Sequence, residues 1–306
     1  MKVYVTGAGG FIGHHLVREL RQQGHRVSGL VGATGDGFPE PIGLEQAHYF
    51  DVADPQLMTQ AINGCDAVIH LAGPASVAAS FENPRHYLRT HAEGTLAVVQ
   101  ACKTCKISRL IHLSSAEVYG DPGPGPVAES AELKARSPYG AAKIAAEQLI
   151  RSSVSAYGLK AVILRPFSIY GPGMSARSLI GTLFSELSKN TAIRIQTLSP
   201  VRDYVSVWDA VAAICLALQW EGQFEIFNLC SGEGISVHRL IQLAQTVFQA
   251  DLPIFETGSP RPTDLTYLVG NPQKIQSQLQ WQAQINLQEG LARLHSEEKT
   301  KVREAK

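Results

Sequence analysis

The first thirteen residues place the strongest constraint on the fold of this chain. An apolar run over residues 2–6 is followed by Gly7, Gly10 and Gly13. Apolar residues then recur at helical spacing as far as Gln23. Glycines have no Cβ, so a phosphate can approach the first turn of the helix, where free amides and the helix dipole favour an anion. The pattern predicts a strand, a phosphate-binding turn and a helix, and Gly13 would let the helix lie close to the sheet.

The composition is that of an ordinary globular protein. The 306 residues are 44% hydrophobic and 18% charged, which suits one large or two unequal domains. Lys plus Arg equals Asp plus Glu at 27 each, so no net field would recruit nucleic acid or an anionic membrane. No apolar run approaches the roughly 20 residues that cross a bilayer, and no leader precedes the first strand. We therefore expect a cytoplasmic protein with neither nucleic acid nor membrane as partner.

The cysteines give no sign of a metal site. There are five of them, an odd number, and most lie in apolar stretches, as is typical of reduced thiols. Cys102 and Cys105 form a solitary CxxC pair, without a second pair or nearby histidine ligands. We expect these two residues to fill a helix end, and we expect no metal.

Apolar runs after the first helix are typical of further strands. They alternate with helical patterns, which predicts a doubly wound parallel sheet of the Rossmann type in an α/β fold. Ligands bind such sheets at the carboxyl ends of the strands, and Ser114 and Ser115 follow one of these runs directly. The expected strands cover residues 26–31, 48–51, 66–73 and 108–115.

The second strand lacks the residue that would choose the cofactor. In dinucleotide-binding folds an acidic side chain at its end often holds the adenosine ribose. Here that position is Val31, and neither Gly32 nor Ala33 replaces the acid. The sequence therefore does not decide between NAD and NADP as the cofactor. Asp51 could reach an adenine amino group or could simply be a turn residue, whereas Asp54 is typical of a helix N-cap.

A tyrosine and a lysine stand four residues apart at the start of another expected helix. The run 137–143 begins with Ser-Pro, and the spacing puts Tyr139 and Lys143 on one face about a turn apart. A free tyrosine has a pKa near 10, so a neighbouring cation is needed to favour the phenolate. Lys143 would supply that charge and make Tyr139 a useful base.

Taken in order, these motifs resemble the extended short-chain dehydrogenase/reductase family, in its nucleotide-sugar epimerase/dehydratase branch. The resemblance implies a Rossmann domain over 1–172 that carries the catalytic residues. It also implies a smaller C-terminal α/β lobe for the substrate over most of 173–295, with some strands returning to the first domain, and a charged tail over 296–306. The resembling residues are 6–13, 70–73, 94–95, 114–120, 137–143, 164–172, 202–205, 228, 231–232 and 261–262.

The resemblance also implies roles for single residues. Tyr139 would be the base at a sugar hydroxyl, Lys143 would hold the nicotinamide ribose, and Ser115 would hydrogen-bond the reacting oxygen. A hydride would pass between sugar C4 and the nicotinamide of NAD or NADP. Besides Tyr139 and Lys143, the implied cofactor contacts are Gly7, Gly10, Phe11, Ile12, Gly13, Asp51, Val52, Leu71, Ala72 and Gly73. The implied contacts to a nucleotide-diphosphate sugar are Ser76, Ser168, Arg202 and Arg261, the arginines facing phosphates or ribose.

Two positions depart from the family pattern. Ser168 stands where the family usually has Asn, and its shorter side chain reaches less far. His91 stands where the family often has Asn, ahead of Gly94 and Thr95 on the helix behind the active site. Either change could retune the substrate or the proton network.

Three reactions share this framework: epimerisation through a 4-keto sugar, dehydration to a 4-keto-6-deoxy sugar, and reduction of such a ketone. Glu117 stands where family dehydratases and decarboxylases place a glutamate that can act as general base. Ala116, however, replaces the neighbouring aspartate of the deoxythymidine-diphosphate type. We favour a nucleotide-sugar 4-epimerase, with a GDP-4-keto-6-deoxyhexose reductase as the alternative. A dehydratase and a non-catalytic NAD(P)-binding regulator are further alternatives. The family also implies a homodimer that packs through the helices over 83–103 and 139–157.

Overall fold

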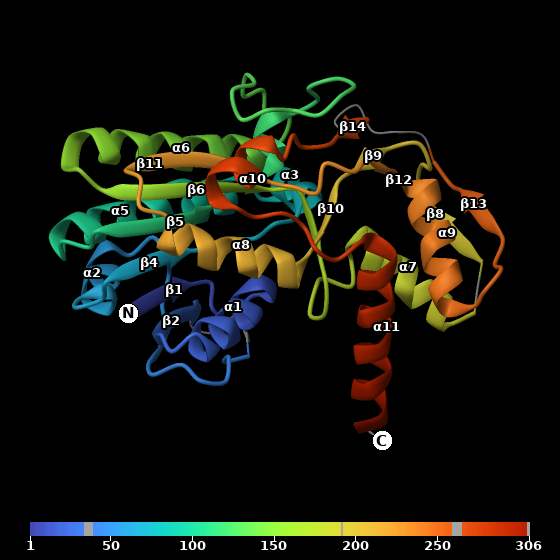
Figure 1. Cartoon of the computed structure of the whole chain (residues 1–306), viewed down its shortest axis with the longest axis horizontal. Helices are drawn as coiled ribbons and strands as arrows, with labels where there is room; N and C mark the ends of the chain where they lie inside the picture. Colours follow the sequence, from blue (N-terminus) through green and yellow to red (C-terminus); the bar gives the residue numbers. More distant parts are fainter. Residues whose placement is uncertain (34–38, 191, 259–264, 305–306) are drawn as a thin grey trace.

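A seven-stranded parallel sheet forms the larger part of the computed structural model, which describes residues 1–33, 39–190, 192–258 and 265–304 (Figure 1). The strand order is β3-β2-β1-β4-β5-β6-β11, and every neighbouring pair is parallel. The order changes direction between β1 and β4, as in doubly wound folds. This confirms the predicted Rossmann class. The strands are β1 Lys2–Thr6, β2 Arg26–Gly32, β3 Ala47–Tyr49, β4 Ala67–His70, β5 Arg109–Leu113, β6 Lys160–Pro166 and β11 Phe224–Leu229.

Helices cover both faces of this sheet (Figure 1). Alternate side chains of a strand point to opposite faces, so Val3 and Val5 enter the core shared with α1 and α8, while Tyr4 enters the core shared with α2, α5 and α6. Both cores are built mainly of apolar side chains, which is why the strands appear in the sequence as nearly continuous apolar runs. The helices are α1 Phe11–Gln22, α2 Pro55–Ile62, α5 Gly94–Thr104, α6 Pro138–Tyr157, α8 Val207–Gln219 and α10 Gln273–Leu279.

The second half of the chain contributes to both parts of the molecule. β11, α8 and α10 lie after residue 172 but belong to the layers of the large sheet. The remaining elements enclose a separate apolar core, built mainly on α7, α9 and α11, and form a smaller lobe beside the carboxyl ends of the strands (Figure 1). Its elements are β7 Ser168–Tyr170, α7 Leu179–Ser188, β8 Ile193–Ile195, β9 Val201–Arg202, β10 Tyr204–Ser206, β12 Ile235–Ser236, α9 Val237–Phe248, β13 Ile254–Glu256, β14 Tyr267–Leu268 and α11 Leu287–Glu304.

Two stretches differ in detail from the sequence expectation. The helix expected over 83–103 consists of α4 Pro84–Leu88, a π-helical turn η1 Arg89–Glu93, and α5. Most of the expected charged tail continues α11 as far as Glu304. Leu291 and Leu294 of α11 are buried in the core of the smaller lobe, which anchors this helix. No helix of the described residues is long and apolar enough to cross a membrane.

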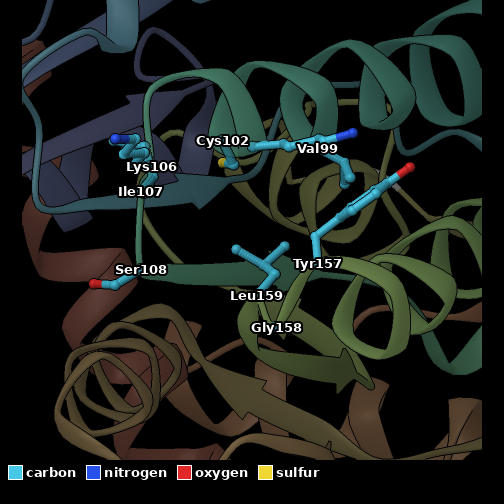
Figure 2. Close-up of a pocket in the computed structure, with 9 residues that line it drawn as sticks. Val99, Cys102, Lys106, Ile107, Ser108, Tyr157, Gly158 and Leu159 are labelled. Carbon is cyan, nitrogen blue, oxygen red and sulfur yellow. The ribbon is translucent and has the colours of Figure 1, made fainter.

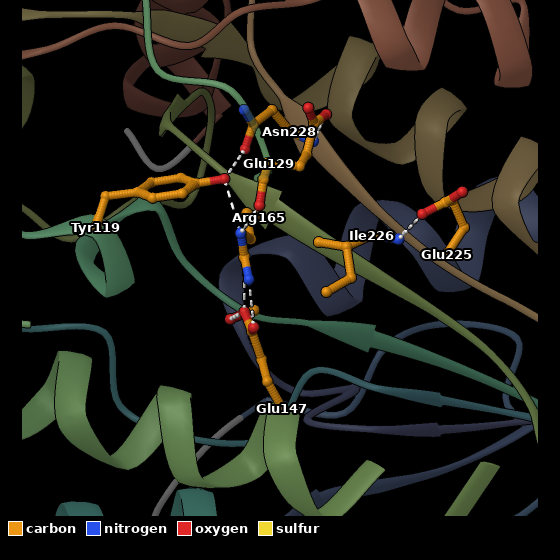
Figure 3. Close-up of polar contacts among 8 residues, drawn as sticks. Tyr119, Glu129, Glu147, Arg165, Glu225, Ile226 and Asn228 are labelled. Carbon is orange, nitrogen blue, oxygen red and sulfur yellow. Dashed lines mark hydrogen bonds and ion pairs between the residues drawn. The ribbon is translucent and has the colours of Figure 1, made fainter. Parts of the chain in front are cut away.

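A buried polar network joins the elements that carry the carboxyl edge of the sheet (Figure 3). Arg165 of β6 donates to both carboxylate oxygens of Glu147 in α6, at 2.9 and 2.6 Å, and both side chains are 2% exposed. Glu147 also accepts from the Ser114 hydroxyl at 2.6 Å. On the other side, Arg165 donates to the Tyr119 hydroxyl, which donates to the Asn228 side chain in β11 at 2.6 Å. The network therefore ties β5, β6, α6 and β11 together.

Loss of one partner of the buried ion pair should destabilise the fold strongly. We expect Glu147→Gln to lower the free energy of unfolding by about 3–5 kcal/mol, because it leaves the Arg165 charge uncompensated in the core. Urea unfolding followed by circular dichroism measures this. The matched control is Glu132→Gln, whose partner Lys134 is exposed with it at the surface, so that little change is expected. Equal midpoints for the two variants would contradict the assignment of Glu147 as an anchor.

Candidate active site

The turn between β1 and α1 has the geometry of a phosphate cradle. Gly7 has a φ of +72°, and a Cβ there would lie 2.9 Å from the backbone of Ala72. A Cβ on Gly13 would overlap the carbonyl oxygen of Gly7. Residue 7 must therefore be glycine because of its backbone conformation, and residue 13 must be glycine because of its close packing.

No N-cap side chain accepts a hydrogen bond from the backbone amides in the first turn of α1. The N-cap of α1 is Gly10, which makes no side-chain cap, whereas Asp54, Ser137 and Ser206 cap α2, α6 and α8. Phe11 and Ile12 occupy this uncapped turn. Free amides at a helix N-terminus bind anions, so the pyrophosphate of a dinucleotide fits this part of the structure.

The segment after β4 forms the other wall of the cradle. The hydroxyl of Thr6 accepts from the amides of Leu71 and Ala72, each at 3.2 Å, which fixes this backbone beside the glycine turn. Gly73 follows with a φ of +136°, and a Cβ there would overlap the ring of His91. The wall lies between β1 and β4, where the strand order changes direction and such folds bind their ligands.

Asp51 and Val52 have structural contacts of their own. Asp51 accepts from the amide of Ala53 at 2.9 Å and from the Arg89 side chain at 2.8 Å. Val52 is buried, and it lies so close to Gly94 that a Cβ there would be 2.8 Å from its methyl group. The role of both residues in cofactor binding stays a prediction.

The structure brings the three expected catalytic residues together at the carboxyl edge of the sheet. Ser115 is the second residue after β5, and its side chain is close enough to Tyr139 to act on the pKa of the phenol. Ser137 caps α6 by accepting from Gly140 at 3.1 Å, which fixes Tyr139 in the first turn. Lys143 follows one turn later. Ser115, Tyr139 and Lys143 are 7%, 6% and 4% exposed, so the reacting groups are shielded from water.

Burial controls the protonation of this site. It raises the pKa of Tyr139 to about 12, although the nearby Ser115 side chain opposes the rise. It lowers the pKa of Lys143 to about 7, and the charge of Glu147 opposes that fall. The expectation that Lys143 lowers the pKa of Tyr139 is not met in this arrangement. Lys143 donates to the carbonyl of Leu113 at 2.7 Å, and its nitrogen lies 6.0 Å from the centre of the Tyr139 ring.

Two buried histidines surround Lys143, and sequence reasoning did not place them in the site. His70 of β4 is hydrogen-bonded to the hydroxyls of Thr6 and Thr95, at 2.7 and 3.0 Å. His112 stands opposite it in β5, with ring centres 5.1 Å apart. Burial, and to a smaller extent the charge of Lys143, lowers the pKa of both imidazoles. They are therefore neutral near pH 7, and they add no charge around the lysine.

A third histidine contacts the expected catalytic tyrosine. The rings of His91 and Tyr139 lie 5.3 Å apart, and the Tyr87 ring packs against Tyr139 at 6.0 Å. His91 donates through Nε2 to the carbonyl of Pro74 at 2.9 Å, and burial lowers its pKa to about 2. The only feature of the sequence that drew attention to His91 was that this position departs from the family pattern.

The structure also brings Arg202 of β9 close to Glu117. Burial raises the pKa of the Glu117 carboxyl, and the charge of Arg202 opposes this. Arg202 itself donates to the carbonyls of Val201 and Leu265, at 2.9 and 2.8 Å. The roles of Glu117 and Arg202 stay predictions.

The other expected substrate residues are less well defined. Ser76 caps the short helix α3 Val77–Glu82, accepting from Ala79 at 3.2 Å. Ser168 lies in β7, next to the partly buried end of β6. Arg261 lies outside the described residues. Their contacts with a substrate stay predictions.

A cavity of about 280 Å³ lies at the opposite end of the sheet (Figure 2). Its lining includes Ile107, Ser108 and Leu159, which precede β5 and β6, and the Lys103 ammonium lies 4.1 Å from the centre of the Tyr157 ring beside it. Doubly wound sheets bind their ligands at the carboxyl ends of the strands, so this cavity is not the candidate active site.

The close packing of the glycine turn gives a test of the cradle. We expect Gly13→Ala to lower the affinity for NAD or NADP by at least about tenfold, because the new methyl group displaces the Gly7 carbonyl and opens the turn. Gly10→Ala should cost less, since its Cβ would meet the same oxygen at 3.2 Å. Calorimetric titration of each variant with both dinucleotides measures the effect. Unchanged affinity in Gly13→Ala would rule out this cradle.

The chain is similar to known proteins over its whole length. A UDP-glucose 4-epimerase of Mycolicibacterium smegmatis is 30% identical, covering 96% of this chain and 97% of that protein. A GDP-6-deoxy-D-mannose reductase of Pseudomonas aeruginosa is 26% identical and covers 99% of both chains.

Solved structures with the same architecture contain cofactor and substrate. The UDP-glucose 4-epimerase of Thermotoga maritima, solved with UDP-glucose, superposes with a TM-score of 0.90 at 25% identity, covering 99% of this chain and all of that one. MoeE5 superposes with a TM-score of 0.91 at 27% identity, covering 98–99% of this chain and all of that one, and has been solved with NAD together with UDP-glucuronic acid or UDP-glucose. The model of the NAD dependent epimerase/dehydratase family matches residues 3–230, and this chain belongs to that family.

Proposed function

We propose that this protein is an NAD-dependent 4-epimerase of a UDP-sugar. The observation that carries the proposal is the pair of buried hydroxyls, Ser115 and Tyr139, which lie together beside the dinucleotide cradle. Two such hydroxyls can bind one sugar oxygen, and one of them can take its proton. The family and the relatives that act on UDP-sugars support the same choice.

NAD fits the residues that the structure provides for it. The uncapped turn of α1 would hold the pyrophosphate, with Gly7 and Gly13 keeping the backbone close, and Lys143 would bind the nicotinamide ribose. When bound, NAD would supply the hydride acceptor and donor that the reaction needs, and its positive charge would favour the phenolate form of Tyr139. MoeE5 binds NAD in the same fold, which supports NAD over NADP.

The protein residues carry out the proton transfer and the orientation. Tyr139 takes the C4 hydroxyl proton as the C4 hydride leaves, and it returns the proton when the hydride is delivered to the other face of the 4-keto sugar. Ser115 holds the same oxygen in place. Lys143 stabilises the phenolate when it is charged, and the Leu113 carbonyl fixes its position. The cycle consumes neither cofactor nor proton.

The lobe formed by the second half of the chain would bind the nucleotide. Arg202 lies in β9 of this lobe, and its charge acts on the Glu117 carboxyl, which supports a role for its guanidinium group in binding the diphosphate. Ser76 and Ser168 would complete the sugar site, and Arg261 would add a second guanidinium group. This assignment rests on the family pattern together with the position of Arg202.

A reductase of a 4-keto-6-deoxy sugar is the second candidate. The Pseudomonas aeruginosa reductase matches this chain over 99% of both lengths, which supports that alternative. A dehydratase has less support, because Ala116 supplies no acid beside Glu117. The two main candidates differ in how they use the cofactor: an epimerase regenerates NAD in every cycle, whereas a reductase consumes one reduced cofactor for each product.

We further propose a homodimer in the cytoplasm. Leu88, Leu96 and Tyr157 are 52%, 40% and 53% exposed on α4, α5 and α6, and a second copy packed on these helices would cover them. All five cysteines are free thiols, which suits a reducing compartment.

Removal of one hydroxyl should stop turnover without loss of fold. We expect Tyr139→Phe to lower kcat for the interconversion of UDP-glucose and UDP-galactose by about 10²- to 10⁴-fold, because the base is lost. The matched control is Tyr157→Phe on the same helix, whose exposed hydroxyl lies far from the site. Coupled assays and thermal melts of both variants measure turnover and stability. Equal turnover in the two variants would exclude Tyr139 as the base.

The cofactor that accompanies the purified protein separates the two candidate reactions. We expect denatured protein to release close to one NAD per chain, since an epimerase that regenerates its cofactor has no need to exchange it. Mass spectrometry of the released nucleotide identifies and counts it. A chain that is empty after purification, and that oxidises added NADPH or NADH with a 4-keto sugar, would favour the reductase.

A further inference from the structure

Two buried aromatic side chains pack against Tyr139, and the proposed mechanism gives neither of them a role. The ring centres of Tyr87 and His91 lie 6.0 and 5.3 Å from that of Tyr139, and 5.9 Å from each other. Both residues are 2% exposed. His91 lies in the π-helical turn η1, and such turns are frequent at functional sites. The three rings therefore form one buried cluster around the expected base.

Tyr87 and His91 also bind one short segment, residues 73–76, which follows the wall of the dinucleotide cradle. The Tyr87 hydroxyl donates to the carbonyl of Ser76 at 2.7 Å. Nε2 of His91 donates to the carbonyl of Pro74 at 2.9 Å, so the proton of this neutral imidazole is on Nε2. Two side-chain donors from one stretch of helix thus hold the segment beside the aromatic cluster.

Close packing gives the same segment little freedom. Nδ1 of His91 has no hydrogen-bond partner among the described residues, and it lies against Gly73, where a Cβ would be 2.5 Å from it. The backbone of Gly73 therefore rests directly on the imidazole ring. A displacement of the segment towards the cluster would press this backbone onto the ring.

The wall that precedes this segment depends on a different contact. The Thr6 hydroxyl accepts from the amides of Leu71 and Ala72, each at 3.2 Å. These bonds involve neither of the two aromatic donors. Loss of one donor should therefore loosen residues 73–76 and leave the dinucleotide cradle in place.

The position of the segment matters because it lies between an expected sugar contact and the base. Ser76, the last residue of the segment, is an expected contact of the sugar, and the rings that bind the segment also pack on Tyr139. Catalysis needs reacting groups that are close and aligned, and a misplacement of about 1 Å can lower a rate about a hundredfold. A shift of the segment would move the sugar relative to the phenol.

We infer that Tyr87 and His91 are positioning residues, which hold residues 73–76 in register with the Tyr139 phenol so that a bound sugar meets the base in reactive geometry. The inference rests on the proposed function, because it assumes that the sugar binds between this segment and Tyr139. Neither residue exchanges a proton with the substrate in this role. The role also gives a reason for the histidine at residue 91, where the family often has asparagine.

The test uses variants that remove one donor and keep as much of the side chain as the chemistry allows. Tyr87→Phe keeps the ring and loses the hydroxyl. In His91→Gln the amide nitrogen can reach the place of Nε2, whereas the shorter side chain of His91→Asn cannot. The control is His238→Asn, which changes an exposed histidine of α9. Each NAD-loaded protein is assayed for turnover of UDP-glucose and for its affinity for UDP-glucose by calorimetry.

We expect Tyr87→Phe and His91→Asn to lower kcat at least about tenfold, because the sugar is misaligned with the base. His91→Gln should retain most of the turnover, and His238→Asn all of it. The amount of NAD released per chain on denaturation should be the same in every variant, since the cradle is left in place. Hydrogen exchange, followed by mass spectrometry of peptides over residues 73–80, should be faster in Tyr87→Phe and His91→Asn and unchanged in His91→Gln.

The combined readouts separate positioning from a general loss of structure. A fall in kcat that merely follows the melting temperatures of the variants would overturn the inference. Equal losses in His91→Gln and His91→Asn, or faster exchange with unchanged kcat, would also overturn it.

Failure of the proposed reaction gives a different result. If the unmodified protein binds UDP-glucose but does not turn it over, the proposed reaction is overturned. In that case, faster exchange together with weaker binding of UDP-glucose in Tyr87→Phe and His91→Asn would still support the positioning role. Unchanged binding in these variants would overturn the positioning role as well.

Discussion

The buried ion pair between Glu147 and Arg165 is the interaction on which the catalytic edge of the sheet depends. Tyr139, Lys143 and Glu147 follow one another at four-residue spacing, so they form one polar stripe on the inner face of α6. A helix normally turns an apolar stripe to the sheet, because buried ionisable groups lose their hydration. Arg165 compensates the charge of Glu147 with two hydrogen bonds. This pairing holds α6 in the position that presents Tyr139 and Lys143.

The same pair also shapes the electrostatics of the site. Among the described residues, the charge of Glu147 is the one that raises the pKa of Lys143. Glu147 shares this charge with Arg165. The lysine is therefore only weakly supported as a cation, and burial brings its pKa to about 7. The phenol of Tyr139 is held in its protonated form for the same physical reason. A tyrosine that stays protonated until the ligands bind does not act as a base on water in the empty site.

Much of the fold and the catalytic centre could be predicted from the sequence because their signals are local. Glycine spacing predicted the cradle, and the spacing of Tyr139 and Lys143 predicted that they are neighbours. What the sequence could not supply depends on residues that are distant in the chain. The family resemblance implied that some later strands return to the first domain, but the identity of that strand, β11 beside β6, and the pairing of Glu147 with Arg165 have no local pattern. The rise in the pKa of Tyr139 was missed because it depends on burial, which spacing does not reveal.

The two residues after Ser115 suggest how one scaffold supports different reactions and substrates. Both lie in the 3-10 helix η2 Ala116–Tyr119, whose backbone is fixed by its cap on Ser115 and by its contact with Gly140, so their side chains can change without disturbing the catalytic groups. Ala116 is fully buried and offers no proton donor, which removes an acid that dehydration would use. Burial raises the pKa of the Glu117 carboxyl, and the charge of Arg202 opposes this rise, so the surroundings of this side chain, and not its identity alone, set its protonation.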